Sequence, residues 1–317
     1  MIDTARILPQ VLAHYTLDIA RHEHVRTSEN IVLKLWTAEG RPLALRIRKT
    51  PGPCSAEVLS ELVVLHEFNT RTGAIVPAPV AARDGRLFCT VPLADEIYLC
   101  VIFNWVPGVH VAADQITPAQ MAAMSRAVAQ LHNFSATFRP AADFARPAYD
   151  DEWFFGSKTW SADPGFVALL SPDAIAYLQK ANASIHDRLR NFPRNPDTFG
   201  LIHYDLHPGN FLFQENAAHM IDFDECGFGD YLFDLAHILF EFIDESRFPE
   251  FRDLALAEYA VARSGAPVPA SNLQLFLALQ GIAYLNWLHR IFRRDGNIEA
   301  PGFWIPRIIR RLQTVLA

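Results

Sequence analysis

The sequence lacks a long apolar run and a paired-cysteine motif. No stretch approaches the roughly 18 consecutive apolar residues that a membrane span needs. Residues 1–11 carry acidic and basic side chains without a continuous apolar run, so we expect no secretory signal. The four cysteines lie far apart and form no C-x-x-C pair, which favours reduced thiols. These absences predict a cytoplasmic protein that does not cross a membrane.

An excess of basic residues is also missing. The chain has 28 Lys and Arg against 35 Asp and Glu, which gives a formal net charge of −7. A nucleic-acid-binding protein normally presents a basic face, so no nucleic-acid partner is expected. Half of the 317 residues are hydrophobic and 20% are charged. This composition favours folded cores, in one large domain or two modest ones, over disorder.

Alternating residues predict a small β-rich lobe at the start of the chain. Residues 31–36 and 43–48 alternate apolar and polar side chains around a Gly-containing turn, as in a β-hairpin. Apolar residues at helical spacing predict a helix over residues 56–70. Further strands are expected at residues 86–91 and 97–103. The last of these is apolar throughout, which favours a central strand.

Helical patterns dominate after a break at residues 104–108, Asn-Trp-Val-Pro-Gly, which predict a connector. Thr117 and Pro118 supply an N-cap and a first-turn proline for a helix that reaches about residue 132. Residues 138–164 show no clear period. Further helices are expected at residues 172–191, 231–244, 250–264, 270–293 and 303–316.

These patterns predict an α+β fold with two lobes. The small β-rich lobe covers residues 1–103, the connector residues 104–108, and the larger, mainly helical lobe residues 109–317.

A compact polar motif lies between apolar residues in the second lobe. Asp205 is followed by Asn210 five positions later and by Asp222 after another twelve. Phosphoryl transfer from a Mg-nucleotide needs such groups, because one carboxylate must orient a hydroxyl and accept its proton. An amide oxygen and a second carboxylate must hold the metal ions. The alternative is that each residue only caps a turn or a strand end.

With this motif, the chain resembles the aminoglycoside phosphotransferase and choline kinase family, the small-molecule relatives of protein kinases. The resemblance is strong over residues 199–239 and moderate over residues 30–108. It implies a bilobal protein-kinase-like fold with ATP and Mg²⁺ as cofactors. It also implies Asp205 as the catalytic base, with Asn210 and Asp222 as the Mg²⁺ ligands.

The resemblance gives supporting roles to three further polar residues. His203 and His207 would brace the catalytic loop. Their His-x-Asp-x-His spacing also looks like a zinc-ligand string, but His219 and His237 show no matching motif. Asp234 is flanked by apolar residues, and a buried carboxylate needs several donors. Backbone N–H groups of the catalytic loop would provide them.

The first lobe holds candidates for phosphate binding. By resemblance, Arg46 stands where a basic residue grips the α- and β-phosphates, with Glu61 of the following helix as its partner. Arginine suits bidentate phosphate contacts, although a solvated strand edge is the alternative. No Gly-x-Gly-x-x-Gly sequence precedes the hairpin. We expect backbone N–H groups, with Ser28 and Asn30, to cover the phosphates instead.

Two more contacts are expected at the end of the last strand and in the connector. Phe103 and Trp105 would contribute to nucleotide binding, with backbone groups of this segment facing adenine. Their location between the lobes is the basis for this expectation.

The predicted function is transfer of the ATP γ-phosphate to a hydroxyl of a small molecule, such as an aminoglycoside-, choline- or homoserine-like acceptor. Candidate walls for the acceptor are residues 149–155 and the late-helix residues Tyr284, Trp287 and His289. Acidic and aromatic residues together suit a cationic acceptor. For residues 149–155, a solvated loop with a packed aromatic end is an equal alternative. The sequence does not indicate an oligomeric state.

The residues favour three other functions less. A Ser/Thr protein kinase would need an activation segment, but only seven residues separate Asp222 from Asp230. A nucleotide-sensing pseudokinase would be expected to lose Asp205 or Asp222, and both are present. A metallohydrolase would bind stoichiometric zinc.

Overall fold

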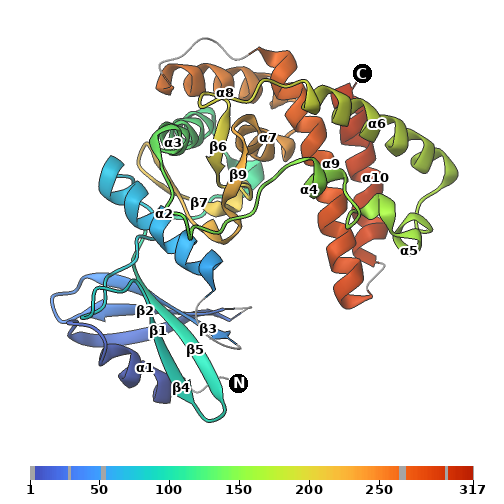
Figure 1. Cartoon of the computed structure of the whole chain (residues 1–317). Helices are drawn as coiled ribbons and strands as arrows, with labels where there is room; N and C mark the ends of the chain where they lie inside the picture. The colour runs from blue at the N-terminus through green and yellow to red at the C-terminus, as the bar shows by residue number, and fades with distance from the viewer. Residues whose placement is uncertain (1–3, 28–29, 51–54, 264–268, 297–298, 317) are drawn as a thin grey trace. The chain divides into compact units, whose positions relative to one another are not determined.

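The chain divides into two compact units. The computed structural model describes residues 4–27, 30–50, 55–263, 269–296 and 299–316. Unit 1 consists of residues 1–109, 139–146 and 219–224, and unit 2 of residues 110–138, 147–218 and 225–317. Unit 1 contains the larger sheet and unit 2 is mainly helical (Figure 1). The α+β fold expected from the sequence is therefore confirmed, whereas the boundaries at residues 103 and 108 stay a prediction.

Unit 1 contains a five-stranded antiparallel sheet with the strand order β1-β2-β3-β5-β4. Its strands are β1 (Ile19–Thr27), β2 (Ile31–Thr37), β3 (Pro42–Thr50), β4 (Cys89–Leu93) and β5 (Glu96–Asn104). Strand β5 lies between β3 and β4, so the apolar segment is an interior strand, as predicted. Strand β1 was not predicted, because its side chains are almost all exposed and give no apolar alternation.

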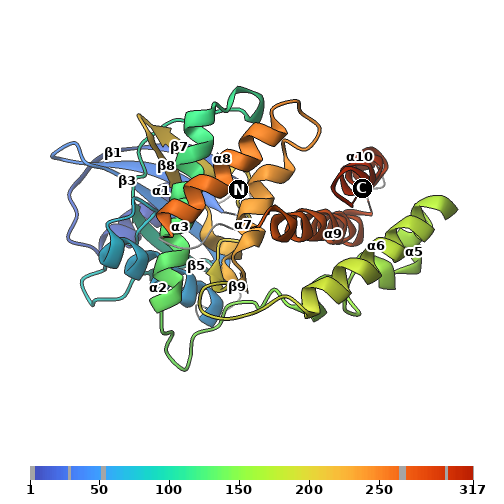
Figure 2. The same ribbon diagram turned by 90° about the horizontal axis from the view of Figure 1, so that it is seen from above.

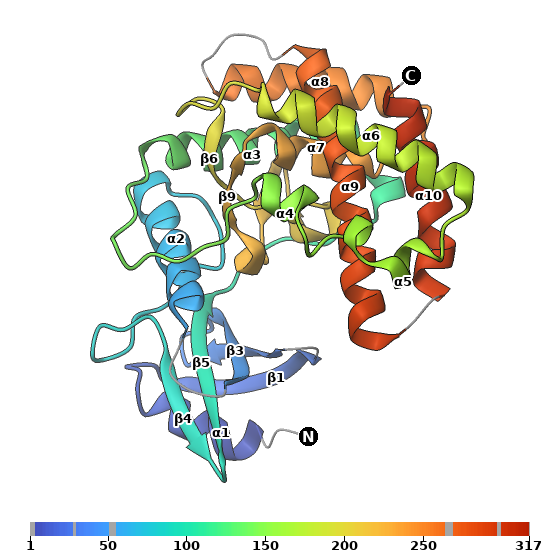
Figure 3. The same ribbon diagram turned by 45° about the vertical axis from the view of Figure 1, so that its right-hand side comes forward.

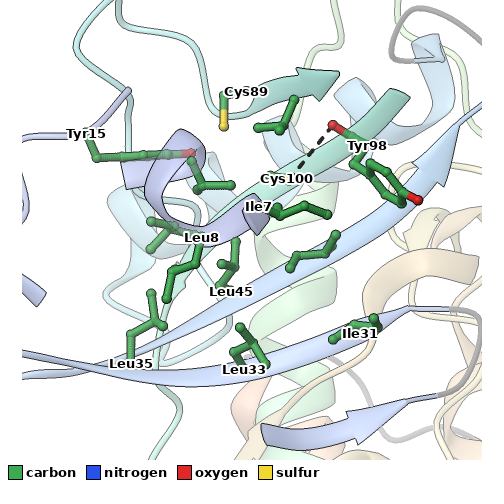
Figure 4. Packing of buried hydrophobic residues seen from close by; sticks show 14 of the residues in the cluster. Ile7, Leu8, Tyr15, Ile31, Leu33, Leu35, Leu45, Cys89, Tyr98 and Cys100 are labelled. Carbon is green, nitrogen blue, oxygen red and sulfur yellow. Dashed lines mark hydrogen bonds between the residues drawn. The ribbon is translucent and has the colours of Figure 1, made fainter. Parts of the chain in front are cut away.

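One face of this sheet carries the apolar core of unit 1. Leu33 of β2 pairs with Leu45 of β3, and both are buried. Helix α1 (Thr4–Leu12), which the sequence analysis missed, adds Ile7 and Leu8 to the same cluster (Figure 4). Burial of apolar surface is the main stabilising contribution here.

Helix α2 (Ala56–Thr72) follows the hairpin and matches the helix predicted at residues 56–70. Ser55 caps its start, and Gly73 ends it in the left-handed conformation with φ 71°. The segment of residues 139–146 is tied to this helix, because the Ala145 N–H donates to Ser60 Oγ at 2.8 Å.

In unit 2, helix α9 (Ala270–Asp295) contacts α7 (Leu232–Phe240) and α10 (Glu299–Leu316). Helices α9 and α10 lie side by side (Figure 2). The other long helices are α3 (Pro118–Thr137), α6 (Pro172–Arg190) and α8 (Phe248–Ala262). Each lies within a few residues of a predicted helix, except that α3 continues five residues past residue 132.

The segment without a clear period, residues 138–164, contains only short elements. They are α4 (Asp151–Phe155), which contacts α9 (Figure 3), and the 3₁₀ turn η2 (Trp160–Ala162). Two other short elements are η1 (Ala113–Gln115), which precedes α3, and α5 (Pro164–Val167), which follows η2. A single helical turn has too few residues for a repeating apolar pattern.

The polar motif lies among short strands. Strand β6 (Phe199–Ile202) pairs with β9 (Gly227–Asp230), and β7 (Phe211–Gln214) forms a two-stranded sheet with β8 (Ala217–Met220). Asp205 follows β6 and precedes the 3₁₀ turn η3 (Pro208–Asn210), and Asp222 precedes η4 (Phe223–Glu225). Among the described residues, no helix is long and apolar enough to cross a membrane.

Candidate active site

Asp234 of α7 holds the backbone that leads into Asp205. Its side chain is fully buried, and its two oxygens accept the N–H groups of His203 at 2.9 Å and Tyr204 at 2.8 Å. Burial alone would raise the pKa of Asp234, but hydrogen bonds from His132 and from this backbone lower it below its ordinary value. The carboxylate therefore stays ionised and fixes the two residues before Asp205.

His132 of α3 completes this support, and no sequence pattern predicted it. Its Nε2 lies 3.1 Å from Asp234 Oδ2, and its Nδ1 lies 2.8 Å from the Tyr259 hydroxyl. Burial lowers the pKa of His132, so the ring is neutral. A neutral ring has one N–H. Donation from Nε2 to the carboxylate leaves Nδ1 to accept from Tyr259.

Tyr204 adopts a backbone conformation that is unusual for a residue with a side chain. Its φ is +73°, in the left-handed region. The ring stacks on Tyr149 at a centroid distance of 3.6 Å, and its hydroxyl accepts a hydrogen bond from Trp153 Nε1 at 2.8 Å. These contacts offset the backbone strain. The next residue, Asp205, then points away from the packed core.

Asp205 has a side chain that is 41% exposed and held from one side by Asn210. Asn210 Nδ2 donates to the Asp205 backbone carbonyl at 2.8 Å and to Oδ2 at 3.2 Å. Gly209 makes the turn between them. A Cβ there would lie 2.7 Å from His207 Cε1, so a side chain at this position would displace the His207 ring.

Two histidine rings flank the Asp205 carboxylate. His207 Nδ1 accepts the Gly209 N–H at 3.0 Å, and its Nε2 lies 4.0 Å from Asp205 Oδ2. His237 Nδ1 donates to the Tyr204 carbonyl at 2.7 Å, and its Nε2 lies 3.7 Å from Asp205 Oδ1. Burial lowers the pKa of His237, although Asp205 opposes this effect. The His237 ring is thus neutral and is held in a fixed position beside the carboxylate.

Asp205 opens into a cavity that lies entirely within unit 2 and has a volume of about 550 Å³. This volume is typical of small-molecule sites. The lining comes from the Asp205 loop, η1, α7, α9 and α10. Tyr284 and Trp287 are among the lining residues, as the sequence analysis expected.

The other two expected walls do not line this cavity. Tyr149, in the expected stretch of residues 149–155, is buried against Tyr204. His289 is also buried, and its Nε2 lies 3.0 Å from Asp163 Oδ2. Tyr149 is used in packing and His289 in a hydrogen bond with a distant residue, and a sequence pattern does not reveal such contacts.

Unit 1 brings Arg46 and Glu61 together in a bidentate pair. Arg46 Nη1 and Nη2 donate to Glu61 Oε1 and Oε2 at 2.8 and 3.0 Å. Burial alone would lower the pKa of the Arg46 guanidinium, but the carboxylates of Glu61, Asp224 and Asp222 raise it. Arg46 is therefore a fixed cation in the electrostatic field of Asp222.

Asp222 also lies in unit 1, with an exposed side chain and a φ of +66°. Asp tolerates the left-handed region better than most residues do. Strand β8 ends two residues before it.

The remaining candidates for nucleotide binding differ in their burial and in their contacts. Phe103 of β5 is buried beneath Arg46, with 5.0 Å between the guanidinium carbon and the ring centroid. Lys34 Nζ lies 3.9 Å from the ring centroid of Trp105. Asn30 Oδ1 is buried without a hydrogen-bond partner among the described residues. Ser28 lies outside the residues that the structure describes.

The donor groups fit a hard divalent cation. Asn210 uses its amide nitrogen on Asp205, and Oδ1 has no hydrogen-bond partner in the described part of the chain. Asp222 contributes an exposed carboxylate. Amide and carboxylate oxygens are the ligand types that Mg²⁺ prefers. Within the described ranges, no group of three or more His, Cys, Asp or Glu side chains is arranged to hold a metal by itself.

Comparisons with known proteins place this fold and motif in a family. Residues 25–270 match the phosphotransferase enzyme family. The chain is 22% identical to the amicoumacin kinase of Bacillus subtilis (strain 168) over 300 residues, which cover 90% of this chain and 85% of that protein.

Solved structures show the same fold. A microcompartment-associated aminopropanol kinase matches with a TM-score of 0.74 and 27% identity, over 98% of this chain and 95% of that one. An amicoumacin kinase in complex with AMP-PNP and Ca²⁺ matches with a TM-score of 0.76 and 19% identity, over 98% and 93%. The family match covers most of the sequence and confirms the kinase-like fold and phosphoryl transfer from ATP to a small-molecule hydroxyl as the activity. The chain belongs to the phosphotransferase enzyme family.

Proposed function

We propose that Asp205 is the catalytic base of this phosphotransferase and that the acceptor hydroxyl binds in the unit 2 cavity. The observation that carries the proposal is the position of the Asp205 carboxylate. Asn210 holds it from one side, and its half-exposed oxygens border a cavity of about 550 Å³. A carboxylate that is both fixed and accessible can align a hydroxyl before reaction.

The chemistry follows from this position. The acceptor hydroxyl donates its hydrogen to a carboxylate oxygen of Asp205, which points the hydroxyl oxygen at the γ-phosphorus. As the oxygen–phosphorus bond forms and the bond to ADP breaks, the proton moves to Asp205. His237 is the weaker base, because burial leaves its side chain 7% exposed and lowers its pKa.

The metal and phosphate ligands complete the proposal. Asn210 in unit 2 and Asp222 in unit 1 are each proposed as an oxygen ligand of Mg²⁺, which neutralises phosphate charge when bound. Arg46 would contact phosphate oxygens with the guanidinium that Glu61 orients. Asn30, Phe103 and Trp105 stay as proposed nucleotide contacts, together with Ser28.

The acceptor is proposed to be a small cationic molecule in the cytoplasm. Asp205, Glu225 and Glu241 line the cavity beside aromatic rings, which favours a positive charge. The described cysteines Cys89 and Cys100 are free thiols, which supports a reducing compartment.

Incubation with γ-labelled ATP and Mg²⁺ tests this function. The acceptor panel should hold amino alcohols, sugars, amino sugars, hydroxylated amino acids and a protein substrate such as casein. We expect label on a small molecule and none on protein. Labelled casein without a labelled small molecule would contradict the proposal.

A further inference from the structure

A ring nitrogen beside Asp205 faces the cavity, and phosphoryl transfer as described above does not use it. This atom is Nε2 of His237 in α7, which lies 3.7 Å from Asp205 Oδ1, and both residues line the cavity. We propose that His237 Nε2 accepts a hydrogen bond from a donor on the carbon next to the reacting hydroxyl of the substrate. The substrate is then a vicinal diol or a 1,2-amino alcohol. This inference rests on the proposed function, because it assigns the substrate class of the same cavity.

The hydrogen of the His237 ring is fixed on the other nitrogen. Nδ1 lies 2.7 Å from the Tyr204 carbonyl oxygen, which can only accept, so Nδ1 carries the hydrogen and donates it. Burial lowers the pKa of His237, so the ring is neutral and has a single N–H. Nε2 therefore presents a lone pair and acts as a hydrogen-bond acceptor.

This lone pair is open to the cavity, although most of the side chain is enclosed. His237 as a whole residue is 6% exposed. Nε2 has no hydrogen-bond partner among the described residues, since its distance to Asp205 exceeds hydrogen-bond length. It is nevertheless not one of the unpaired polar atoms that these residues enclose completely. The accessible part of the His237 side chain therefore includes Nε2.

Two polar side chains near this nitrogen already use their donors elsewhere. The ring centroid of Tyr284 is 5.8 Å from that of His237, but the Tyr284 hydroxyl donates to Glu241 Oε1 at 2.5 Å. Asn210 Nδ2 donates to the backbone carbonyl and to Oδ2 of Asp205. Neither side chain therefore provides a donor for Nε2.

Two hydrogen-bond acceptors thus face each other across 3.7 Å, Nε2 of His237 and Oδ1 of Asp205. His207, the other ring beside the carboxylate, has its Nε2 4.0 Å from the second oxygen, Oδ2. An enclosed acceptor without a donor costs free energy, because it has lost hydration without a replacement. A ligand that brings two donors removes this cost at both atoms.

The spacing of the two acceptors favours donors on neighbouring carbon atoms. A hydrogen bond spans about 2.7 to 3.0 Å between its heavy atoms. The reacting hydroxyl has one hydrogen, which it donates to Asp205, so it has none for His237. A second group on the next carbon is close enough to donate to Nε2. Because Nε2 is neutral, this contact selects for a donor and not for positive charge.

Pairs of substrates that differ in this donor test the inference. 2-Aminoethanol is compared with choline, which keeps the positive charge but has no N–H. Propane-1,2-diol is compared with 1-methoxypropan-2-ol, in which a methyl group replaces the hydrogen of the neighbouring hydroxyl. With γ-labelled ATP and Mg²⁺, kcat/KM should be at least about 10-fold higher for the donor-bearing member of each pair. Equal kcat/KM within both pairs would overturn the inference.

Two variants of His237 separate this contact from a structural role. H237Q places an amide oxygen near the position of Nε2 but has no donor near Nδ1, whereas H237N keeps a donor near Nδ1 and has no group at Nε2. H22N, at an exposed position of β1, is the control. H237N should reduce the preference for donor-bearing substrates to within about twofold, while H237Q and H22N retain it. The reverse order of H237N and H237Q would show that His237 only supports the Tyr204 carbonyl, and it would overturn the inference.

Nitrogen NMR of the protein labelled with ¹⁵N-histidine tests the site without turnover. The wild-type protein is titrated with the four compounds in the presence of AMP-PNP and Mg²⁺, and H237N identifies the His237 resonances. 2-Aminoethanol and propane-1,2-diol should shift the Nε2 resonance, whereas choline and the methyl ether should not. This result supports the inference even if no labelled product forms and the proposed function fails. An Nε2 resonance that none of the compounds shifts, or that all four shift equally, overturns it.

Discussion

Single residues show where the sequence predicts the site and where it does not. Asp205, Asn210 and Asp222 are recognisable because their chemistry depends on residue type and on spacing along the chain. His132 lies 102 positions from Asp234. Its role arises only when distant segments pack together, so a sequence pattern contains no signal for it.

Tyr204 gives a prediction at this scale, because its backbone is left-handed while its ring is tightly packed. Tyr204→Ala and Tyr204→Gly both lose the stack on Tyr149, but only glycine removes the backbone strain. We expect Tyr204→Gly to be more stable than Tyr204→Ala by about 1 kcal/mol, the reverse of the usual order in regular structure. Urea unfolding of both variants measures this difference. An alanine variant as stable as the glycine variant would contradict it.

At the scale of elements, the long helices could be predicted because each buries a stripe or carries a recognisable cap. Helix α3 begins as expected at Thr117 and Pro118. The two elements that the sequence analysis did not predict are α1 and β1. Helix α1 contains Pro9 and only nine residues, and β1 is an edge strand with exposed polar side chains. Such elements are held by contacts with the sheet rather than by their own pattern.

The start of α3 supplies the second prediction. Thr117 Oγ1 accepts the Gln120 N–H at 3.3 Å, and Gln120 Oε1 accepts the Thr117 N–H at 2.9 Å, which is a capping box. Thr117→Ala removes one half of it and should destabilise the protein by about 1 kcal/mol. Thr314→Ala, on the exposed surface of α10, is the matched control and should change the free energy of unfolding by less than about 0.5 kcal/mol. Chemical denaturation measures the free energy of unfolding of both variants. An equal loss of stability in the two would refute a capping role for Thr117.

For the whole molecule, buried histidines predict how stability depends on pH. Burial lowers the pKa of both His132 and His237 in the folded chain. In the unfolded chain these two histidines bind protons near pH 6.5, whereas in the folded chain they do not. Stability is therefore full above pH 6.5 and falls as the pH drops below that value, by up to about 1.4 kcal/mol per pH unit for each histidine.

Unfolding free energies at pH 7.5, 6.5 and 5.5 check this dependence. His237→Gln should reduce the slope below pH 6.5, whereas His22→Gln, at an exposed position of β1, should not. A slope of the same size in the His237→Gln protein would show that other groups control the acid side of the stability curve.

The whole molecule acts as a phosphotransferase, and its central test is the role of Asp205. Asp205→Asn keeps the shape of the side chain and the contact with Asn210 but removes the base, while Asp197→Asn is an exposed control. With labelled ATP, Mg²⁺ and the best acceptor of the panel, Asp205→Asn should lower kcat by about 10² to 10⁴ with little change in Mg-ATP affinity. The control should retain wild-type kcat. An Asp205→Asn protein that transfers phosphate at the wild-type rate would contradict the account.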